Sequence, residues 1–176
     1  REAEEVLERI RRRLEEHLED NERILREIKK RLDEHREKSK RVNDRSRELV
    51  ERLLAVKREG KVDEEKVERL KKENEDLLRE LDKHLEELKR RIRKLHEDNR
   101  RHNKELEDEI RRLEREANLS EDIVREIRRI VRELHERSKD SNREVERLVR
   151  KLEDDHRESV ERNRELLKKL EDDLRR

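Results

Sequence analysis

Residues 58–65 read REGKVDEE, and this stretch decides the fold because it holds Gly60, the only glycine of the 176-residue chain. Glycine readily adopts the left-handed backbone conformation that ends a helix, and Asp63 is suited to cap the start of the next helix. Val62 and Val67 stand at the spacing of a hydrophobic staple across that start. The stretch therefore predicts a helix, a short turn and a second helix.

A second interruption lies at residues 117–122, which read ANLSED. Here Asn118 can close a helix, Ser120 can cap the next one, and Leu119 can pack onto Val124 as a staple. Everywhere else Leu, Ile and Val recur at steps of three and four among strong helix formers. We therefore expect helices over about residues 2–58, 64–117 and 121–175.

These short connections predict an all-α fold, a long antiparallel up-down-up three-helix bundle that is coiled-coil-like and forms a single domain over residues 1–176. The inward positions repeat at about 3.5 to 3.6 residues, close to the period of a free helix. Further apolar residues flank each inward stripe and widen it, so three or more helices must meet. As an alternative, a further helix or a second copy could complete a four- or six-helix bundle.

Charged residues make up 61% of the chain, and 54 Lys and Arg nearly balance 53 Asp and Glu. Because the two signs are interspersed, we expect neither nucleic acid nor an anionic membrane as a partner. The chain has no Cys, Met, Phe, Tyr or Trp, which excludes disulfides, Cys-based metal sites and aromatic stacking on bases. No apolar run approaches the about 20 residues of a membrane span, nor do we expect a signal peptide. We expect a soluble protein with no natural compartment, cytoplasmic on recombinant expression.

Many inward positions carry His, Asn or Ser, whereas Glu, Lys and Arg fill the outward positions almost throughout. When the second helix is read backwards, these polar residues fall at matching heights along the bundle. A lone buried polar group costs ~1–3 kcal/mol, so we expect the groups to bond to one another and to fix the register of the helices. The first cluster should contain His17, Asn21, Asn99, His102, Ser138 and Ser141, flanked by His96, Asn103, His135 and Asn142. The second should contain His35, Ser39, His84 and His156. The third, adjoining it, should contain Asn43, Ser46, Asn74, Ser159 and Asn163.

Two chemical alternatives use the same residues. His17, His102 and His135 could converge as a three-nitrogen metal site. However, the inner positions carry no carboxylate to support them, and Asn and Ser are partners of a neutral imidazole, so we expect no metal and no cofactor. His135 and Ser138 have the spacing of a Ser/His pair, but this spacing is common in helices and no oxyanion hole accompanies it. We therefore expect no enzyme activity and no small-molecule substrate.

On these His, Asn and Ser positions, the turns around Gly60 and Ser120, and the Glu, Lys and Arg surface, the whole chain resembles computationally designed helical bundles with buried hydrogen-bond networks. That family includes designed heterodimers and histidine-containing pH-responsive oligomers. Many such designs place two helices in each chain, whereas three are expected here. The resemblance implies a structural or interaction scaffold with pairing specificity, whose partner would be a second copy or a designed helical chain. A natural coiled-coil spacer remains the alternative.

Burial of the histidines would make stability depend on pH. A buried neutral imidazole disfavours protonation, so its pKa should lie below the unfolded value of ~6.5. The unfolded chain would then bind more protons, and stability should fall as the pH drops below that value. This hypothesis concerns six residues, His17, His35, His84, His102, His135 and His156.

Overall fold

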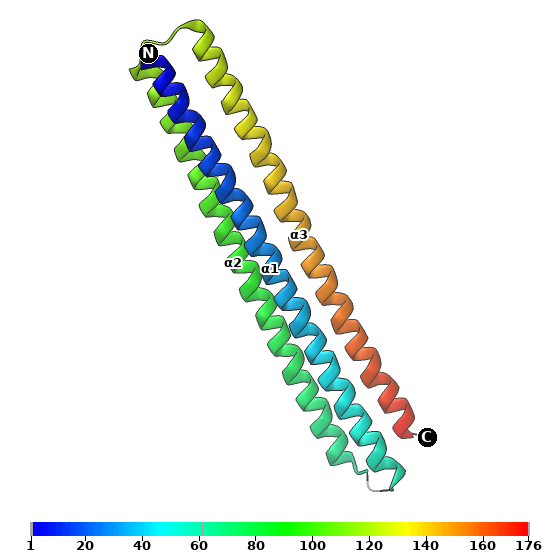
Figure 1. Cartoon of the computed structure of the whole chain (residues 1–176). Coiled ribbons are helices and arrows are strands. Elements are labelled where there is room, and N and C mark those ends of the chain that lie inside the picture. Colours follow the sequence, from blue (N-terminus) through cyan, green and yellow to red (C-terminus); the bar gives the residue numbers. More distant parts are fainter. Residues whose placement is uncertain (1, 61, 176) are drawn as a thin grey trace. The chain divides into compact units, whose positions relative to one another are not determined.

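A computed structural model describes residues 2–60 and 62–175 of the chain (Figure 1). It contains helices α1 (Glu2–Arg58), α2 (Glu64–Glu116) and α3 (Glu121–Arg175), of 57, 53 and 55 residues. The all-α three-helix bundle predicted from the sequence is confirmed. Helix α2 ends one residue before the predicted position 117.

The chain divides into two compact units, each built from segments of all three helices. The first unit contains Arg1–Lys29 and Arg91–Leu148, and the second contains Lys30–Arg90 and Val149–Arg176. The segments of each unit can be followed along α1, α2 and α3 in Figure 1, where the colours give the residue numbers. That residues 1–176 form one domain stays a prediction.

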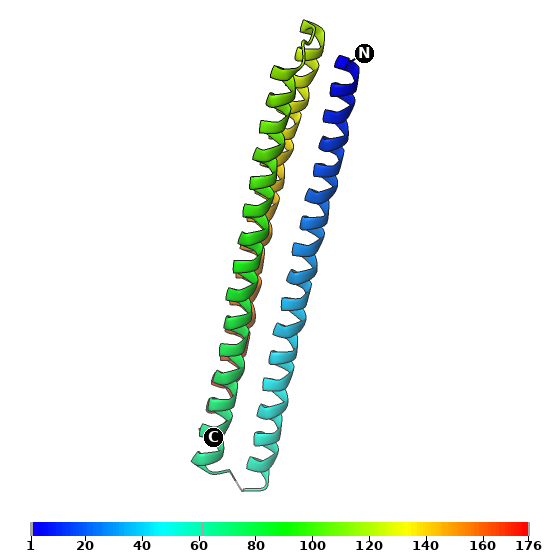
Figure 2. The same ribbon diagram turned by 90° about the vertical axis from the view of Figure 1, so that its left-hand side faces the viewer.

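In the second unit, the connection between α1 and α2 has the features expected of a helix end and a helix start (Figure 2). Gly60 has a φ angle of 75°, the left-handed conformation that glycine adopts without steric cost. The Asp63 carboxylate accepts a hydrogen bond of 2.9 Å from the backbone N–H of Lys66, which caps the first turn of α2. Val62 and Val67 pack against the hydrophobic core next to this turn.

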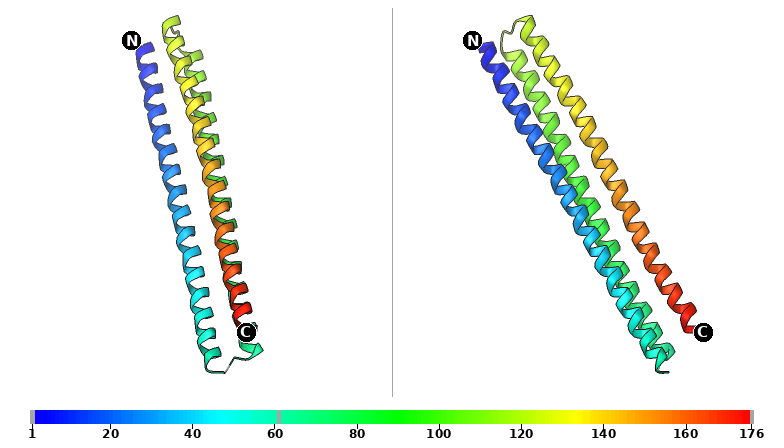
Figure 3. Two further views of the ribbon diagram at one scale, coloured as in Figure 1. Left: turned by 90° about the vertical axis from the view of Figure 1, so that its right-hand side faces the viewer. Right: turned by 45° about the vertical axis from the view of Figure 1, so that its right-hand side comes forward.

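In the first unit, a short connection joins the C-terminal end of α2 to the N-terminal end of α3 (Figure 3). The backbone N–H of Ala117 donates to the carbonyl of Leu113 at 3.2 Å, and that of Val124 donates to the carbonyl of Ser120 at 3.1 Å. Leu119 packs against the core of this unit. The connection is therefore held by backbone hydrogen bonds at its two sides and by the contact of Leu119 with the core.

Each unit has a hydrophobic core with contributions from all three helices. Leu18 and Val131 pack on the first core, and Leu54 and Leu167 pack on the second, so the wide apolar flanks are used within the units. The first core consists of Ile10, Leu14, Leu106, Ile110, Ile127, Ile130 and Leu134. The second consists of Val50, Leu53, Leu70 and Leu170. Over the described residues, none of the three helices is apolar over enough of its length to cross a bilayer.

The inward face of α2 differs in part from the face predicted from the sequence. Leu78, Leu85, Asn99 and Leu106 are buried, and they follow one another at multiples of seven residues. His84 and His102 were predicted to point inward, but His84 is half-buried and His102 is exposed. At residues 102 and 103 the sequence permits either choice, because both side chains are polar, and the packing places Asn103 inward. At residues 84 and 85 Leu85 is buried, and the half-buried His84 still reaches the buried His35.

Candidate functional site

A closed ring of hydrogen bonds lies in the second unit, with one side chain from each helix. The hydroxyl of Ser46 donates to Oδ1 of Asn74 at 2.5 Å, and Nδ2 of Asn74 donates to Oδ1 of Asn163 at 2.7 Å. Nδ2 of Asn163 closes the ring by donating to Oγ of Ser46 at 2.8 Å. Each of the three side chains is 1% exposed. Because each one donates and accepts within the ring, the cost of burying three polar side chains is offset.

The ring continues toward the surface through the same amide. Nδ2 of Asn163 also donates to Oδ1 of Asn43 at 3.1 Å, and Nδ2 of Asn43 donates to Oγ of Ser159 at 2.9 Å. Asn43 is half-buried, whereas Ser159 is buried. The structure thus brings together the five residues of the third cluster: Asn43, Ser46, Asn74, Ser159 and Asn163.

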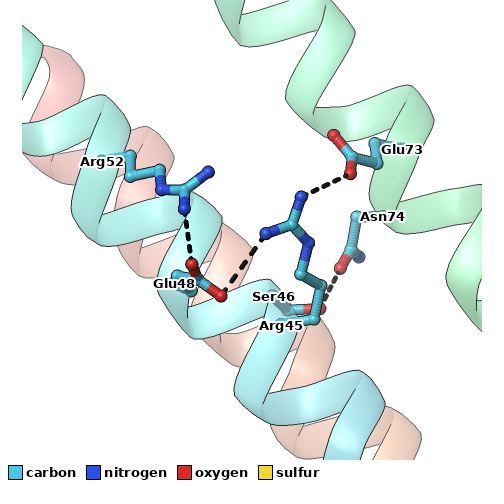
Figure 4. Close-up of polar contacts among 6 residues, drawn as sticks. All are labelled: Arg45, Ser46, Glu48, Arg52, Glu73 and Asn74. Carbon is cyan, nitrogen blue, oxygen red and sulfur yellow. Dashed lines mark hydrogen bonds and ion pairs between the residues drawn. The ribbon is translucent and has the colours of Figure 1, made fainter.

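Ion pairs lie next to the first bond of the ring on the outside of α1 and α2 (Figure 4). Arg45 contacts Glu48 on its own helix and Glu73 on α2, both at 3.4 Å. Arg52 contacts the same Glu48 at 2.6 Å. These side chains are between 41% and 64% exposed, so each pair contributes little to stability. The buried polar contacts at this level are those of the ring, and the ion pairs lie outside it.

A chain of three histidines and one carboxylate lies in the same unit. Nδ1 of His35 is 2.8 Å from Nδ1 of His84, and Nε2 of His35 is 3.1 Å from Nδ1 of His156. Nε2 of His156 is 2.7 Å from Oδ1 of Asp82. The His35 and His84 rings are parallel within 2°, with centroids 5.1 Å apart. The chain therefore runs from α2 to α1, on to α3, and back to α2.

The environment of this chain favours neutral imidazoles at its centre. His35 is 1% exposed, and burial, followed by the nearby His156 and His84, lowers its pKa to about 4. Burial also lowers the pKa of His84, with Lys38 adding to the effect. Both shifts have the direction expected for imidazoles that lose hydration in the fold.

Asp82 is the member of this chain that the sequence analysis missed. It follows the buried Leu81 on the flank of the inward face, and its side chain is 65% exposed. Helices α2 and α3 are antiparallel, so moving about two turns forward in α2 from Asn74 and about two turns back in α3 from Asn163 brings Asp82 level with His156. This alignment was the signal in the sequence that could have identified Asp82. Ser39, predicted for the same cluster, is buried and lines a groove with His35 and Asn43.

The first cluster, in the first unit, is less buried than expected. Its residues fall into three classes of exposure. The buried ones are His17, Asn21 and Asn99. The half-buried ones are His96, Asn103, Ser138, Ser141 and Asn142. The exposed ones are His102 and His135, so the prediction that these two are buried is wrong. In α2 it is Asn103, the next residue, that turns inward, and Nε2 of His135 points to Oε1 of Glu107 at 3.1 Å.

Several polar atoms of this cluster are buried without a hydrogen-bond partner in the part of the chain that the structure describes. They are Nε2 of His17, Oδ1 of Asn21, Oδ1 of Asn103, Oγ of Ser138 and Oδ1 of Asn142. The prediction that the first cluster satisfies its own polar groups is therefore wrong for these atoms. The polar residues of the first cluster come from matching levels of the three helices, but these atoms do not form hydrogen bonds with one another as Ser46, Asn74 and Asn163 do in the second unit.

Burial lowers the pKa of two histidines of this cluster, His17 and His96, in the same direction as that of His35. The pKa of His17 is lowered by burial and, to a smaller extent, by His102 and Arg13. The pKa of His96 is lowered by burial and then by Arg100. His96 therefore joins the group of histidines with depressed pKa values.

No metal centre is formed by residues 2–60 and 62–175, in which no three His, Asp or Glu side chains are placed to hold an ion. Of the three histidines considered for such a site, His17 is buried, whereas His102 and His135 are exposed. The Nδ1 and Nε2 atoms of His35 face two different histidines, so the second cluster does not converge on one point either.

No protein-family profile matches the sequence, and no characterised protein matches it in a sequence comparison. Among solved structures, the chain is similar to one described as a computationally designed three helix bundle. The TM-score is 0.49 and the sequence identity is 17%, and the alignment covers 98% of this chain and 83% of the other. A similarity at this score and identity does not show that this chain shares any property of the other protein.

Proposed function

We propose that the chain is a de novo designed scaffold, rather than an enzyme, whose buried networks fix how its helices pair and make its stability depend on pH. The observation that carries the proposal is the closed ring of Ser46, Asn74 and Asn163, which takes one side chain from each helix. The near absence of residue types other than helix formers and network formers supports a designed origin.

The ring supports pairing specificity because it is satisfied in one register. Sliding α2 by one turn would bring Leu70 or Leu78, both buried now, to the level of Ser46 and Asn163. The polar groups stranded by that shift would cost ~1–3 kcal/mol each. The surrounding apolar layers stabilise many registers about equally, so the ring is the element that selects one.

The lowered pKa values support the pH dependence. The folded state holds the pKa of His17, His35, His84 and His96 below the ordinary value, so the unfolded chain binds more protons as the pH falls. Their contribution to stability is present above about pH 6.5 and decreases toward the folded values, which for His35 means a pKa of about 4.

Chemical denaturation at pH 7.5 and at pH 5.0 tests the proposal, using the parent, His35→Asn and the matched control His102→Asn. His35 alone should account for a loss on the order of 2 kcal/mol between the two pH values, from its pKa of about 4 against ~6.5 unfolded. His35→Asn should therefore lose less stability than the parent. His102 is exposed and is only a secondary cause of the lowered pKa of His17, so His102→Asn should lose nearly as much as the parent. Equal losses in the parent and in His35→Asn would refute the contribution of His35, and a parent that loses no stability between the two pH values would refute the pH dependence as a whole.

The second candidate is an interaction module that pairs with a second copy or with a designed helical partner. It is favoured by Asn103, Ser138 and Asn142, half-buried side chains whose buried polar atoms lack a partner within the described residues. Sedimentation equilibrium separates the two candidates. A species with the mass of one chain supports the self-contained scaffold, and a larger species supports the module.

A further inference from the structure

The histidine chain of the second unit ends at a group that can only accept. A neutral imidazole carries one N–H donor and one acceptor nitrogen, and an ionised carboxylate, as aspartate is at neutral pH, has acceptors only. When His156 is neutral and Asp82 is ionised, the bond between them requires the proton of His156 to be on Nε2. Nδ1 of His156 is then an acceptor, so His35 must donate to it from Nε2.

The same reasoning fixes the last bond. With its proton on Nε2, His35 has an acceptor at Nδ1, and the atom facing it at 2.8 Å is Nδ1 of His84. His84 must therefore carry its proton on Nδ1. In this arrangement each of the three contacts, from Asp82 to His156, from His156 to His35 and from His35 to His84, contains one donor and one acceptor.

We propose that Asp82 is a positioning residue that fixes the tautomers of His156, His35 and His84 and so gives the chain one direction. This goes beyond the proposed function, because it concerns where the protons lie at a single pH and not whether stability changes with pH. A further consequence is that Nε2 of His84 keeps its lone pair. Protonation at that atom leaves every bond of the chain as it is.

At the other end of the chain, the charged groups near His84 within the described residues do not favour one direction. The charged groups that act on His84 are Lys38, Glu34 and Arg31 from α1 and Glu87 from α2, and their signs oppose one another. From α3, the group facing the centre of the chain is His156 itself. Without the carboxylate, the reversed chain would satisfy the two bonds between imidazoles equally well.

Ring nitrogen NMR of the 15N-labelled protein at pH 8 tests this directly, since the two neutral tautomers of histidine have different nitrogen signals. We expect His156 and His35 to carry the proton on Nε2 and His84 to carry it on Nδ1, each as a single form. A mixture of tautomers, or His156 with its proton on Nδ1, would overturn the proposal. This measurement uses the parent at one pH, so it stands apart from the denaturation test of pH-dependent stability.

Substitution of Asp82 provides a second test with a matched control. In Asp82→Lys the end of the chain becomes a donor, so His156 should accept at Nε2, and all three tautomers should reverse. Asp82→Glu keeps a carboxylate and should keep the parent pattern. Asp76→Lys is the control, because Asp76 is exposed on the same helix and pairs with Arg79 at 3.6 Å rather than with a histidine. If Asp82→Lys keeps the parent tautomers, or if Asp76→Lys also reverses them, Asp82 does not direct the chain.

Discussion

Two asparagines, Asn21 and Asn163, are both nearly fully buried but differ in what their amide groups contact. Asn163 is 1% exposed and bonds to Asn74, Ser46 and Asn43. Asn21 is 6% exposed, and its Oδ1 has no partner among the described residues. Both asparagines occupy inward positions in the sequence pattern. In the structure, however, Asn163 belongs to a hydrogen-bond network, whereas the buried Oδ1 of Asn21 costs free energy because no partner offsets its loss of hydration.

This difference predicts opposite results for the same substitution. Asn163→Leu should strand Ser46 and Asn74 at ~1–3 kcal/mol each, against a gain of ~1.5–3 kcal/mol for a buried Leu, for a net loss on the order of 1–3 kcal/mol. Asn21→Leu removes an unpartnered oxygen and adds apolar burial, so stability should stay the same or increase. Urea denaturation of both variants at pH 7.5 measures this. A larger loss in Asn21→Leu than in Asn163→Leu would contradict the assignment of the network.

At the scale of the helices, the start of α2 depends on one side chain. Asp63 accepts the hydrogen bond that satisfies the backbone N–H of Lys66, so Asp63→Ala should destabilise the protein by about 1 kcal/mol. Asp76→Ala is the control, because it removes an exposed carboxylate from the same helix without touching the cap. Thermal denaturation compares the two variants. The cap is unimportant if both lose the same stability.

The helix ends could be predicted because Gly60 and Asp63 are local signals, which act through the backbone of their own neighbours. The third cluster could be predicted because Asn74 and Asn163 are flanked only by charged residues, so neither has an adjacent His, Asn or Ser that could take its place. His102 could not be placed correctly, since His102 and Asn103 both fit the inward period and only the packing of the other helices separates them. Asp82 is on the flank, and its partnership with His156 depends on the relative rotation of α2 and α3, which no local pattern encodes.

Across the whole molecule, the two units differ in how well their buried polar groups are paired. The second unit holds the closed ring, and the first holds five polar atoms without a described partner. Unmade hydrogen bonds lower the free energy of local opening. We therefore expect backbone amides near Asn99 to exchange with deuterium faster than those near Asn74 in native-state hydrogen exchange. Equal protection at the two levels would show that the unpartnered atoms cost nothing.

The rings of His35 and His84 lie edge to edge in nearly one plane, since their Nδ1 atoms are 2.8 Å apart, their planes are parallel within 2° and their centroids are 5.1 Å apart. This arrangement has a spectroscopic consequence, because the chain has no Phe, Tyr or Trp. The seven histidines carry the only aromatic rings, so every ring current in the protein comes from an imidazole. A proton in the plane of a neighbouring ring, beyond its edge, resonates downfield of one in solvent. The carbon-bound ring protons of His35 and His84 next to the shared contact should therefore be shifted downfield of those of the exposed His102 in a one-dimensional spectrum, with no isotope label needed.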